Sequence, residues 1–291
     1  MSDPKAPGKA GANEEKKKNS LVQRVITALV LVTALALVLW AGGWVFAAVV
    51  CLCVAVAIHE MHSALRAGGH HPARWVAYAG LLLGVPLMMF YPAQTIIPLL
   101  MLLTFCVLVH VMLRPDPELT DVLVSVMPVF SIVLPALCLV GLLDSQPRSL
   151  QLMLLIQAFG IAVGGDTLAY FVGSAVGGPK LCPRISPNKT IAGSMGGLFG
   201  SVLMAVLVGR IFAAAAPDLG VAVPVWAEIL LGLVGGCAGQ MGDLFASMVK
   251  RHCKVKDYGT IFPGHGGMMD RLDSVFFVAI VVYCFRVILL V

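Results

Sequence analysis

Three aspartates lie inside or at the ends of apolar stretches, where an ionised carboxylate is costly to place. Asp166 follows the stretch FGIAVGG, Asp243 lies within CAGQMGDLFASMVKR, and Asp270 begins the last apolar run of the chain. A charged side chain at the centre of a bilayer costs roughly 2.5–3.5 kcal/mol or more, so such residues usually line a cavity or pair with another charge. On a helix, Asp270 and Asp273 would share one face. We therefore expect the acids to meet at one polar site.

Basic side chains and glycines accompany these acids in two polar segments, 175–193 and 247–272. Clustered carboxylates with few His or Cys neighbours are hard oxygen ligands of the kind that Mg²⁺ prefers. Lysine and arginine suit phosphate groups, and glycine turns allow backbone N–H groups to approach anionic oxygens. This combination of residue types predicts a site for phosphoryl or nucleotidyl transfer.

The other metal-ligating residue types of the chain do not form a recognised site. The eight cysteines form no CxxC pair and lie mostly in apolar runs, which is typical of buried thiols. The stretch HEMH, from His59 to His62, has histidines at i and i+3, unlike the HExxH of zinc enzymes. We interpret its residues as interfacial, because they fall at the inner end of an expected membrane span.

The elements that must position the acids are membrane helices. The chain is 59% hydrophobic and 12% charged, whereas soluble domains carry about 25% charged residues. A spanning helix needs about 20 apolar residues, and we expect an all-α polytopic membrane protein of about nine transmembrane helices. We divide it into a disordered basic tail (1–20), N-terminal helices (21–150) and a C-terminal catalytic region (151–291). The runs lie at 22–40, 43–59, 76–92, 94–113, 121–143, 150–174, 194–214, 223–246 and 273–290.

The distribution of lysine and arginine predicts the orientation of these spans. With the N-terminus in the cytoplasm and the sides alternating, 17 of the 20 basic residues fall on the cytoplasmic side. Both polar segments, 175–193 and 247–272, then lie on that side as well. We expect a multi-pass protein of the cell membrane whose candidate site faces the cytoplasm at the inner headgroups.

Three segments of the chain resemble one enzyme family. SMVKRHCKVKDYGTIFPGHGGMMDRLDS, residues 247–274, closely resembles the signature of the phosphatidate cytidylyltransferases, also called CDP-diacylglycerol synthases. GDTLAYFVGSAVGGPKLCPRISPNKTIAGSMGG, residues 165–197, and GQMGDL, residues 239–244, are similar to further motifs of that family. The resemblance covers roughly residues 155–285. The chain departs from the family at Ala192 and Ala246, where glutamates are common, and at Leu168, where glycine is usual.

The resemblance implies a reaction and a role for each candidate residue. The phosphate of phosphatidic acid, a membrane lipid, attacks the α-phosphorus of CTP, pyrophosphate leaves, and CDP-diacylglycerol stays in the membrane. Asp243, Asp270 and Lys250 are the expected catalytic residues, and Mg²⁺, with a second cation possible, is held by Asp243 and Asp270, with Asp166 as a weaker third ligand. No nucleic acid partner is expected, and glycine-rich spans permit a homodimer. The expected substrate-binding residues are Lys189, Ser186, Arg251, His265, Gly266, Gly267 and Arg271.

Three alternatives stay open on the sequence. Intramembrane acids also occur in ion- or proton-coupled transporters, although those usually place polar groups at the midplane of several spans. A CTP-dependent lipid kinase would use similar residues but release CDP instead of pyrophosphate. An inactive scaffold on the same frame is the third alternative, because the two family glutamates are missing.

Overall fold

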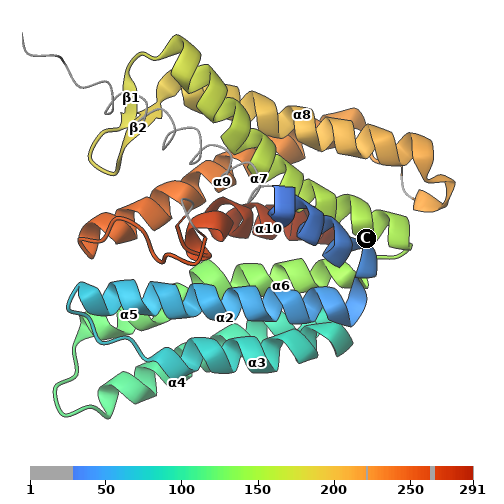
Figure 1. Cartoon of the computed structure of the whole chain (residues 1–291). Helices are drawn as coiled ribbons and strands as arrows, with labels where there is room; N and C mark the ends of the chain where they lie inside the picture. Colours follow the sequence, from blue (N-terminus) through green and yellow to red (C-terminus); the bar gives the residue numbers. More distant parts are fainter. Residues whose placement is uncertain (1–28, 221, 263–265, 291) are drawn as a thin grey trace, which may run out of the picture.

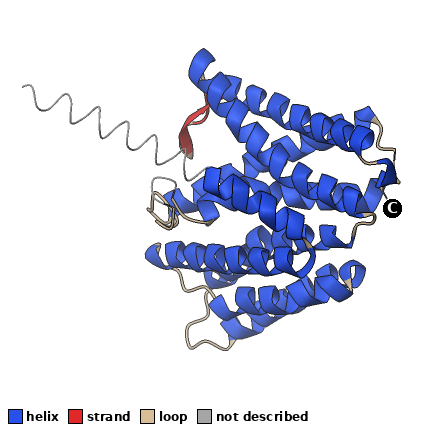
Figure 2. Cartoon of the chain, turned by 45° about the vertical axis from the view of Figure 1, so that its right-hand side comes forward, coloured by secondary structure: helices blue, strands red, loops and turns tan. Residues whose placement is uncertain are grey.

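The computed structural model describes residues 29–220, 222–262 and 266–290, and helices make up most of them (Figures 1 and 2). The rest are loops and two short strands. The helices are Leu29–Ala41, α2 (Gly43–Ala67), α3 (Arg74–Phe90), α4 (Pro92–Met112), α5 (Leu119–Pro128), α6 (Leu134–Gly141), α7 (Arg148–Val176), α8 (Ile191–Ala215), α9 (Val225–His252) and α10 (Met269–Leu289). A π-helical turn (Val129–Val133) joins α5 to α6, 3-10 turns follow at Leu142–Asp144 and Pro217–Leu219, and the strands are β1 (Lys180–Cys182) and β2 (Ser186–Thr190).

The expected all-α polytopic architecture is confirmed. In the described part, seven helical segments are long and apolar enough to cross a membrane, and α5, the π turn and α6 together form one of them. The two remaining apolar helices, Leu29–Ala41 and Arg74–Phe90, are shorter. The expectation of about nine spans is therefore met by seven long segments and two short ones. The expected tail, 1–20, lies outside the described residues.

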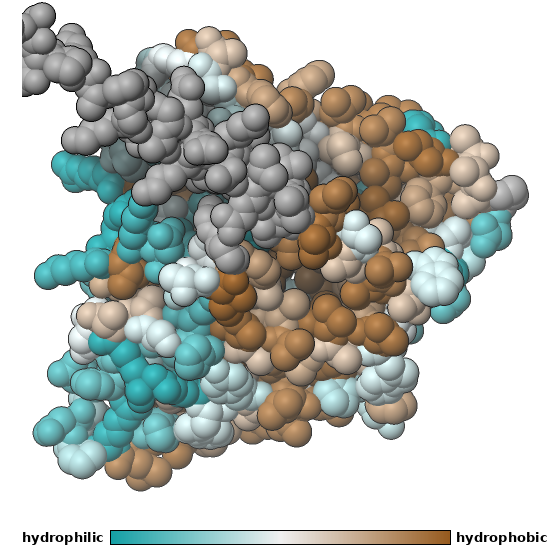
Figure 3. All heavy atoms as spheres, in the orientation of Figure 1, coloured by the Kyte–Doolittle hydropathy of each residue, from teal (hydrophilic) through white to brown (hydrophobic). Residues whose placement is uncertain are grey.

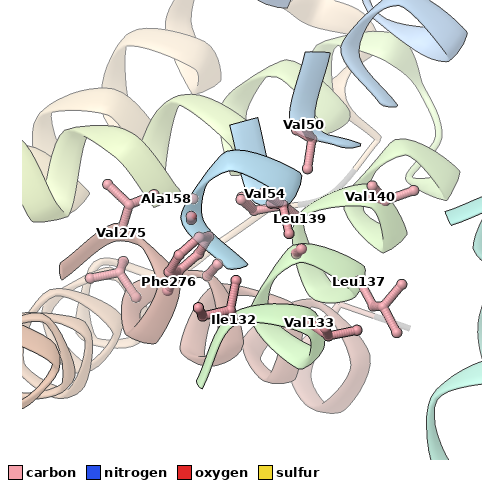
Figure 4. Packing of buried hydrophobic residues seen from close by; sticks show 14 of the residues in the cluster. Val50, Val54, Ile132, Val133, Leu137, Leu139, Val140, Ala158, Val275 and Phe276 are labelled. Atoms are coloured by element: carbon pink, nitrogen blue, oxygen red, sulfur yellow. The ribbon is translucent and has the colours of Figure 1, made fainter. Parts of the chain in front are cut away.

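One hydrophobic core joins the N-terminal helices to the C-terminal ones. Figure 4 shows Val54 of α2, Leu139 of α6, Ala158 of α7 and Phe276 of α10 meeting in it. Phe276 is among the largest fully buried side chains of the chain. Because α10 packs against α2 and α6 as well as α7 and α9, the N-terminal helices help to hold the helix that carries Asp270.

Glycines let α7, α8 and α9 approach one another closely. A Cβ atom at Gly200 of α8 would lie 2.5 Å from the backbone oxygen of Gly164 in α7. A Cβ atom at Gly232 of α9 would lie 2.5 Å from Cα of Val202 in α8. Small residues permit such backbone contact between membrane helices, where packing is a main source of association.

We expect Gly200→Ala to destabilise the protein, because the added methyl group meets backbone that can move only if α7 and α8 separate. Overpacking of this kind costs roughly 1–3 kcal/mol, which thermal unfolding in detergent would detect as a lower Tm. Gly160→Ala is the matched control, since its Cβ would meet only the Met204 methyl group, at 3.2 Å. An equal fall in Tm for both variants would contradict the close-contact interpretation.

The polar groups gather at one end of the bundle, the end at which α2, α4, α7 and α9 finish and α3, α5, α8 and α10 begin. Figure 3 shows hydrophilic side chains at the left and hydrophobic ones over the middle of this face. We call this the polar end; the molecule is a multi-pass membrane protein with its described basic residues concentrated there. They are Arg66, Arg74, Arg114, Lys180, Arg184, Lys189, Lys250, Arg251, Lys254, Lys256 and Arg271.

At the opposite end, the three described arginines all have partners. Arg148 donates from Nη2 to the carbonyl oxygens of Leu39, at 3.2 Å, and Trp40, at 2.7 Å. Arg210 pairs with the buried Glu228, at 2.5 Å, and Arg286 pairs with Asp144, at 2.8 Å. These three arginines hold helix ends together. They are far fewer than the basic residues at the polar end, so the polar end remains the more basic of the two.

Candidate functional site

A β-hairpin between α7 and α8 brings Lys189 to the polar end. The strands β1 and β2 pair antiparallel, with Lys180 opposite Thr190 and Cys182 opposite Ser186. Thr190 ends the hairpin and caps α8, because its Oγ1 accepts a hydrogen bond from Gly193 N at 3.0 Å. The residue before this cap, Lys189, therefore has a fixed direction, and its Nζ lies 2.5 Å from Oδ2 of Asp243.

Asp243 sits on the last turns of α9, among other acids. Its side chain is 29% exposed, and its Oδ1 accepts a long hydrogen bond from Ser247 Oγ at 3.4 Å. Asp166 of α7 and Asp273 of α10 lie close enough for their charges to interact with that of Asp243. Three helices therefore bring three carboxylates to one region, but the third is Asp273 and not Asp270, which the sequence led us to expect there.

A small pocket lies beside these acids, between α7, α8, α9 and α10. Asp166 and Ser274 line it together with Ser201, Gln240 and several glycines, and Ser274 Oγ donates to Oδ2 of Asp166 at 3.0 Å. Its accessible volume of about 10 Å³ is close to the space that one water molecule needs. Most of the lining is apolar side chains and glycines. The pocket is too small for a nucleotide, which must bind outside it.

Asp270 occupies a different environment from Asp243. Its side chain is 5% exposed, and Oδ1 lies 2.6 Å from Nζ of Lys250, whose side chain is 12% exposed. Its Oδ2 accepts hydrogen bonds from the backbone N–H groups of Tyr258, at 2.9 Å, and Gly267, at 3.0 Å. Asp270 thus holds the 253–268 connection against the ends of α9 and α10.

Tyr258 supports the same connection as a neutral phenol. Its hydroxyl donates to the carbonyl oxygen of Ala246 at 3.0 Å, and the Lys250 ammonium lies 5.4 Å from the ring centroid. Burial, followed by the negative charge of Asp270, raises the pKa of the Tyr258 hydroxyl. An ionised phenolate would be repelled by the Asp270 carboxylate and would have no hydrogen to donate to Ala246. Tyr258 therefore stays protonated and acts as a hydrogen-bond donor.

Sequence reasoning missed Glu60, the acid of the HEMH stretch. The stretch lies near the polar end of α2, as expected, but Glu60 and His62 are 4% and 1% exposed and so are packed inside the protein. The Glu60 carboxylate accepts hydrogen bonds from the backbone of Met268 and Met269, at the start of α10. A lone acid near the end of an apolar helix was the available signal, because buried acids in membranes have partners.

The remaining candidates lie at the same end with fewer contacts. Ser186 begins β2 and is partly exposed, and Arg251 Nε donates to the Ile185 carbonyl in the hairpin at a long 3.4 Å. Arg271 is exposed and within range of the Asp166 charge. Gly266 has a positive φ of 82° that favours glycine. The candidate His265 lies outside the described residues.

The acids fit a magnesium ion that is bound mainly through substrate. Within the residues that the structure describes, no three His, Cys, Asp or Glu side chains are grouped to hold a metal ion. Mg²⁺ is commonly held by one or two carboxylates together with substrate phosphates and water. Asp243 and Asp166 suit that arrangement, since each has an oxygen with at most a weak hydrogen bond. Asp270 suits it less, because about three of its four acceptor positions are occupied.

We expect Lys189→Ala to weaken nucleotide binding while leaving the fold intact. The Lys189–Asp243 pair is about a quarter exposed on each side, and exposed pairs contribute roughly 0–1 kcal/mol to stability. Loss of this positive charge should raise the KM for CTP, the nucleotide that the resemblance implies, roughly 10-fold, the effect of about 1.4 kcal/mol. Steady-state kinetics and Tm together check this. Lys180→Ala, an exposed lysine of the same hairpin, is the control; equal KM values for both variants would contradict it.

Comparisons with known proteins point to one family. The model of the cytidylyltransferase family matches residues 22–289. Phosphatidate cytidylyltransferases are similar over shorter stretches: that of Brucella abortus biovar 1 is 45% identical over 127 residues, which is 44% of each chain. Those of Staphylococcus epidermidis and Bacillus subtilis are 45% identical over 133 and 113 residues, or 46% and 39% of this chain and 48% and 39% of theirs. The chain thus spans less than half the length of the curated relatives that it matches.

Proposed function

Because the chain belongs to the cytidylyltransferase family, we propose that it transfers CMP from CTP to phosphatidic acid, producing CDP-diacylglycerol and pyrophosphate. Phosphatidate cytidylyltransferases from three bacteria are 45% identical to it in the matched segments. The proposal takes its substrates from the names of those relatives, and its chemistry from the side chains at the polar end.

The observation that carries the proposal is the pairing of two lysines with two aspartates from separate segments. Lys189 of the hairpin reaches Asp243 of α9, and Lys250 of α9 reaches Asp270 of α10. The first pair is partly open to solvent and the second is buried. An ammonium ion beside a carboxylate can exchange that partner for a phosphate group, so the open pair is the one suited to receive a triphosphate.

Each residue type has a task in this reaction. Lys189, Arg251 and Arg271 supply positive charge for the triphosphate and for the lipid phosphate. Asp243, with Asp166 beside it, would hold Mg²⁺, which neutralises the phosphates and the charge that develops on the leaving pyrophosphate. Lys250 and Asp270 keep the ends of α9 and α10 in register. Catalysis then consists of placing the lipid phosphate in line with the α-phosphorus of CTP and neutralising charge.

The polar end suits one soluble and one lipid reactant. CTP arrives from the aqueous side, whereas phosphatidic acid presents its headgroup at the membrane surface beside the same charges. The concentration of basic residues at this end supports a cytoplasmic position for it, by the positive-inside tendency. We propose a plasma membrane enzyme with a cytoplasmic N-terminus, as the sequence led us to expect.

The test uses the full-length protein in detergent with phosphatidic acid, Mg²⁺ and CTP labelled at the α-phosphate. The proposal requires label to enter the lipid as a CDP-lipid and pyrophosphate to appear in equal amount. CTP labelled at the γ-phosphate serves as the second arm. Transfer of that label to lipid would instead identify a CTP-dependent lipid kinase, and an absence of both products would reject lipid chemistry and leave a transporter or a scaffold.

A further inference from the structure

Glu60 is a buried carboxylate for which the proposed reaction has no role. It lies near the end of α2, more than 200 positions before the residues that it contacts. Its Oε1 accepts a hydrogen bond from Met268 N at 3.1 Å, and its Oε2 accepts one from Met269 N at 2.8 Å. We propose that Glu60 is a positioning residue that fixes the first turn of α10, and with it the site residues on that turn.

The start of α10 needs such a partner. The first N–H groups of a helix have no acceptor within the helix, and the N-cap residue, Met268, provides no side-chain hydrogen bond. The carboxylate of Asp270 holds Gly267 N, and that of Glu60 holds the next two N–H groups. Charged acceptors at this position also complement the helix dipole. Because three consecutive N–H groups are held by two carboxylates, they are not free for a phosphate in this arrangement.

Two glycines of the 247–274 segment lie directly against the Glu60 carboxylate. A Cβ atom at Gly259 would overlap Oε1 of Glu60, and one at Gly267 would overlap Oε2. Both overlaps involve the end of a side chain, but this side chain is 4% exposed and tied to two N–H groups. A larger residue at Gly259 would therefore displace the carboxylate from α10. The side chain of Glu60 thus links the sequence segments 59–62 and 247–274.

The first two turns of α10 matter because they carry Asp270, Arg271 and Asp273. Asp270 pairs with Lys250, and the charge of Asp273 lies near those of Asp166 and Asp243. A shift of about 1 Å in such groups can reduce the rate roughly 100-fold without any loss of substrate contacts. The kinetic part of this inference rests on the proposed function, whereas the structural part does not.

The first experiment compares Glu60→Ala and Glu60→Gln with Glu228→Gln in the full-length protein. Glu228 is also a buried glutamate, but it lies about 33 Å from Lys250 along α9, from the rise of a helix. We expect kcat per folded molecule to fall roughly 100-fold in Glu60→Ala and about 10-fold in Glu60→Gln, which keeps one acceptor oxygen. The KM for CTP should change less than kcat does in both, because Lys189 and Arg251 lie on other elements and only Arg271 moves with α10. Glu228→Gln should keep the wild-type kcat even where it lowers Tm.

A second readout needs no activity. Lys254 and Lys256 are exposed in the connection that Asp270 and Glu60 hold, and trypsin cleaves after lysine. Under native conditions in detergent, Glu60→Ala should be cut there roughly 10-fold faster than the wild type, because proteolysis follows local opening. Glu228→Gln should be cut at the wild-type rate.

A double-mutant cycle with Gly259→Ala tests the contact itself. Gly259→Ala alone should reproduce the kcat defect of Glu60→Ala, and in the Glu60→Ala background it should add little. Non-additivity of this kind is expected of residues in contact. If Glu60→Ala does not fold, Glu60→Gln and Gly259→Ala still decide the matter.

The outcomes separate this inference from the proposed function. Wild-type kcat and wild-type trypsin rates in the Glu60 variants would overturn the positioning role, as would additive effects with Gly259→Ala. A wild-type protein that forms no CDP-lipid would overturn the proposed function, and the trypsin rates would then decide the role of Glu60 alone.

Discussion

Asp243→Asn is expected to abolish CMP transfer while leaving the protein folded. The substitution keeps the shape of the side chain and removes the charge that meets Lys189 and interacts with Asp166 and Asp273. Removing a single electrostatic group from a preorganised phosphate site commonly costs roughly 100- to 1000-fold, and a metal ligand more. We expect kcat/KM to fall roughly 1000-fold or more.

Stability should respond differently from activity in this variant. The Asp243 side chain is 29% exposed, so the lost ion pair is worth roughly 0–1 kcal/mol. The substitution also removes the repulsion between Asp243 and two nearby acids, Asp166 and Asp273, which favours the folded state. The Tm in detergent should therefore stay close to that of the wild type. Asp116→Asn, an exposed aspartate in a loop at the same end, is the control, and activity of Asp243→Asn within threefold of that control would reject Asp243 as a catalytic group.

Asp270→Asn has the second large expected effect, a loss of activity together with a loss of stability. If Asp270 were only the metal ligand that the sequence analysis expects, the variant would lose activity and stay folded. The structure changes the expectation, because Asp270 is 5% exposed and accepts hydrogen bonds from Lys250 and two backbone N–H groups. Removing one member of a buried ion pair costs roughly 3–5 kcal/mol, which corresponds to a fall in Tm of several degrees.

The measurement is a double-mutant cycle of Asp270→Asn and Lys250→Met, followed by thermal unfolding in detergent. Both single variants should be less stable than the wild type, and the double variant should be less destabilised than the sum of the two. Product formation should fall roughly 100-fold or more in all three, since the ends of α9 and α10 lose their register. Asp270→Asn with an unchanged Tm would show that the pair does not hold α10, whereas normal product formation would remove Asp270 from the catalytic residues.

Much of the architecture follows from the sequence because a membrane limits the choices. Backbone polar groups inside a bilayer must be satisfied within the segment, so an apolar run of sufficient length becomes a helix. All nine expected runs are helical in the part of the chain that the structure describes. The concentration of basic residues at one end of the bundle could also be predicted, because it depends only on the order of spans and loops along the chain. The separate tail and the two-part division of the chain stay predictions.

The sequence predicted the kinds of side chain at the candidate site, but not which of them pair with one another. Asp243 and Ser247 are four residues apart on one helix, a spacing that by itself predicts neighbours, and they lie 3.4 Å apart. The partner of Lys250 is instead Asp270 of another helix, α10, at 2.6 Å. Likewise, Lys189 meets Asp243 only because the hairpin ends in the cap of α8. The order of residues along a chain fixes which groups share a helix face, whereas contacts between helices depend on how those helices pack.

The sequence by itself determined a bundle of apolar helices, a charged end and the kinds of side chain gathered there. Only the tertiary structure decided that Asp243 lies partly open while Asp270 is buried, and that Glu60 holds the start of α10. The physical reason is that hydropathy and charge act on each segment separately, so they can be read along the chain. Burial and hydrogen bonding of a carboxylate depend on atoms from several segments at once, and these are set only when the helices meet.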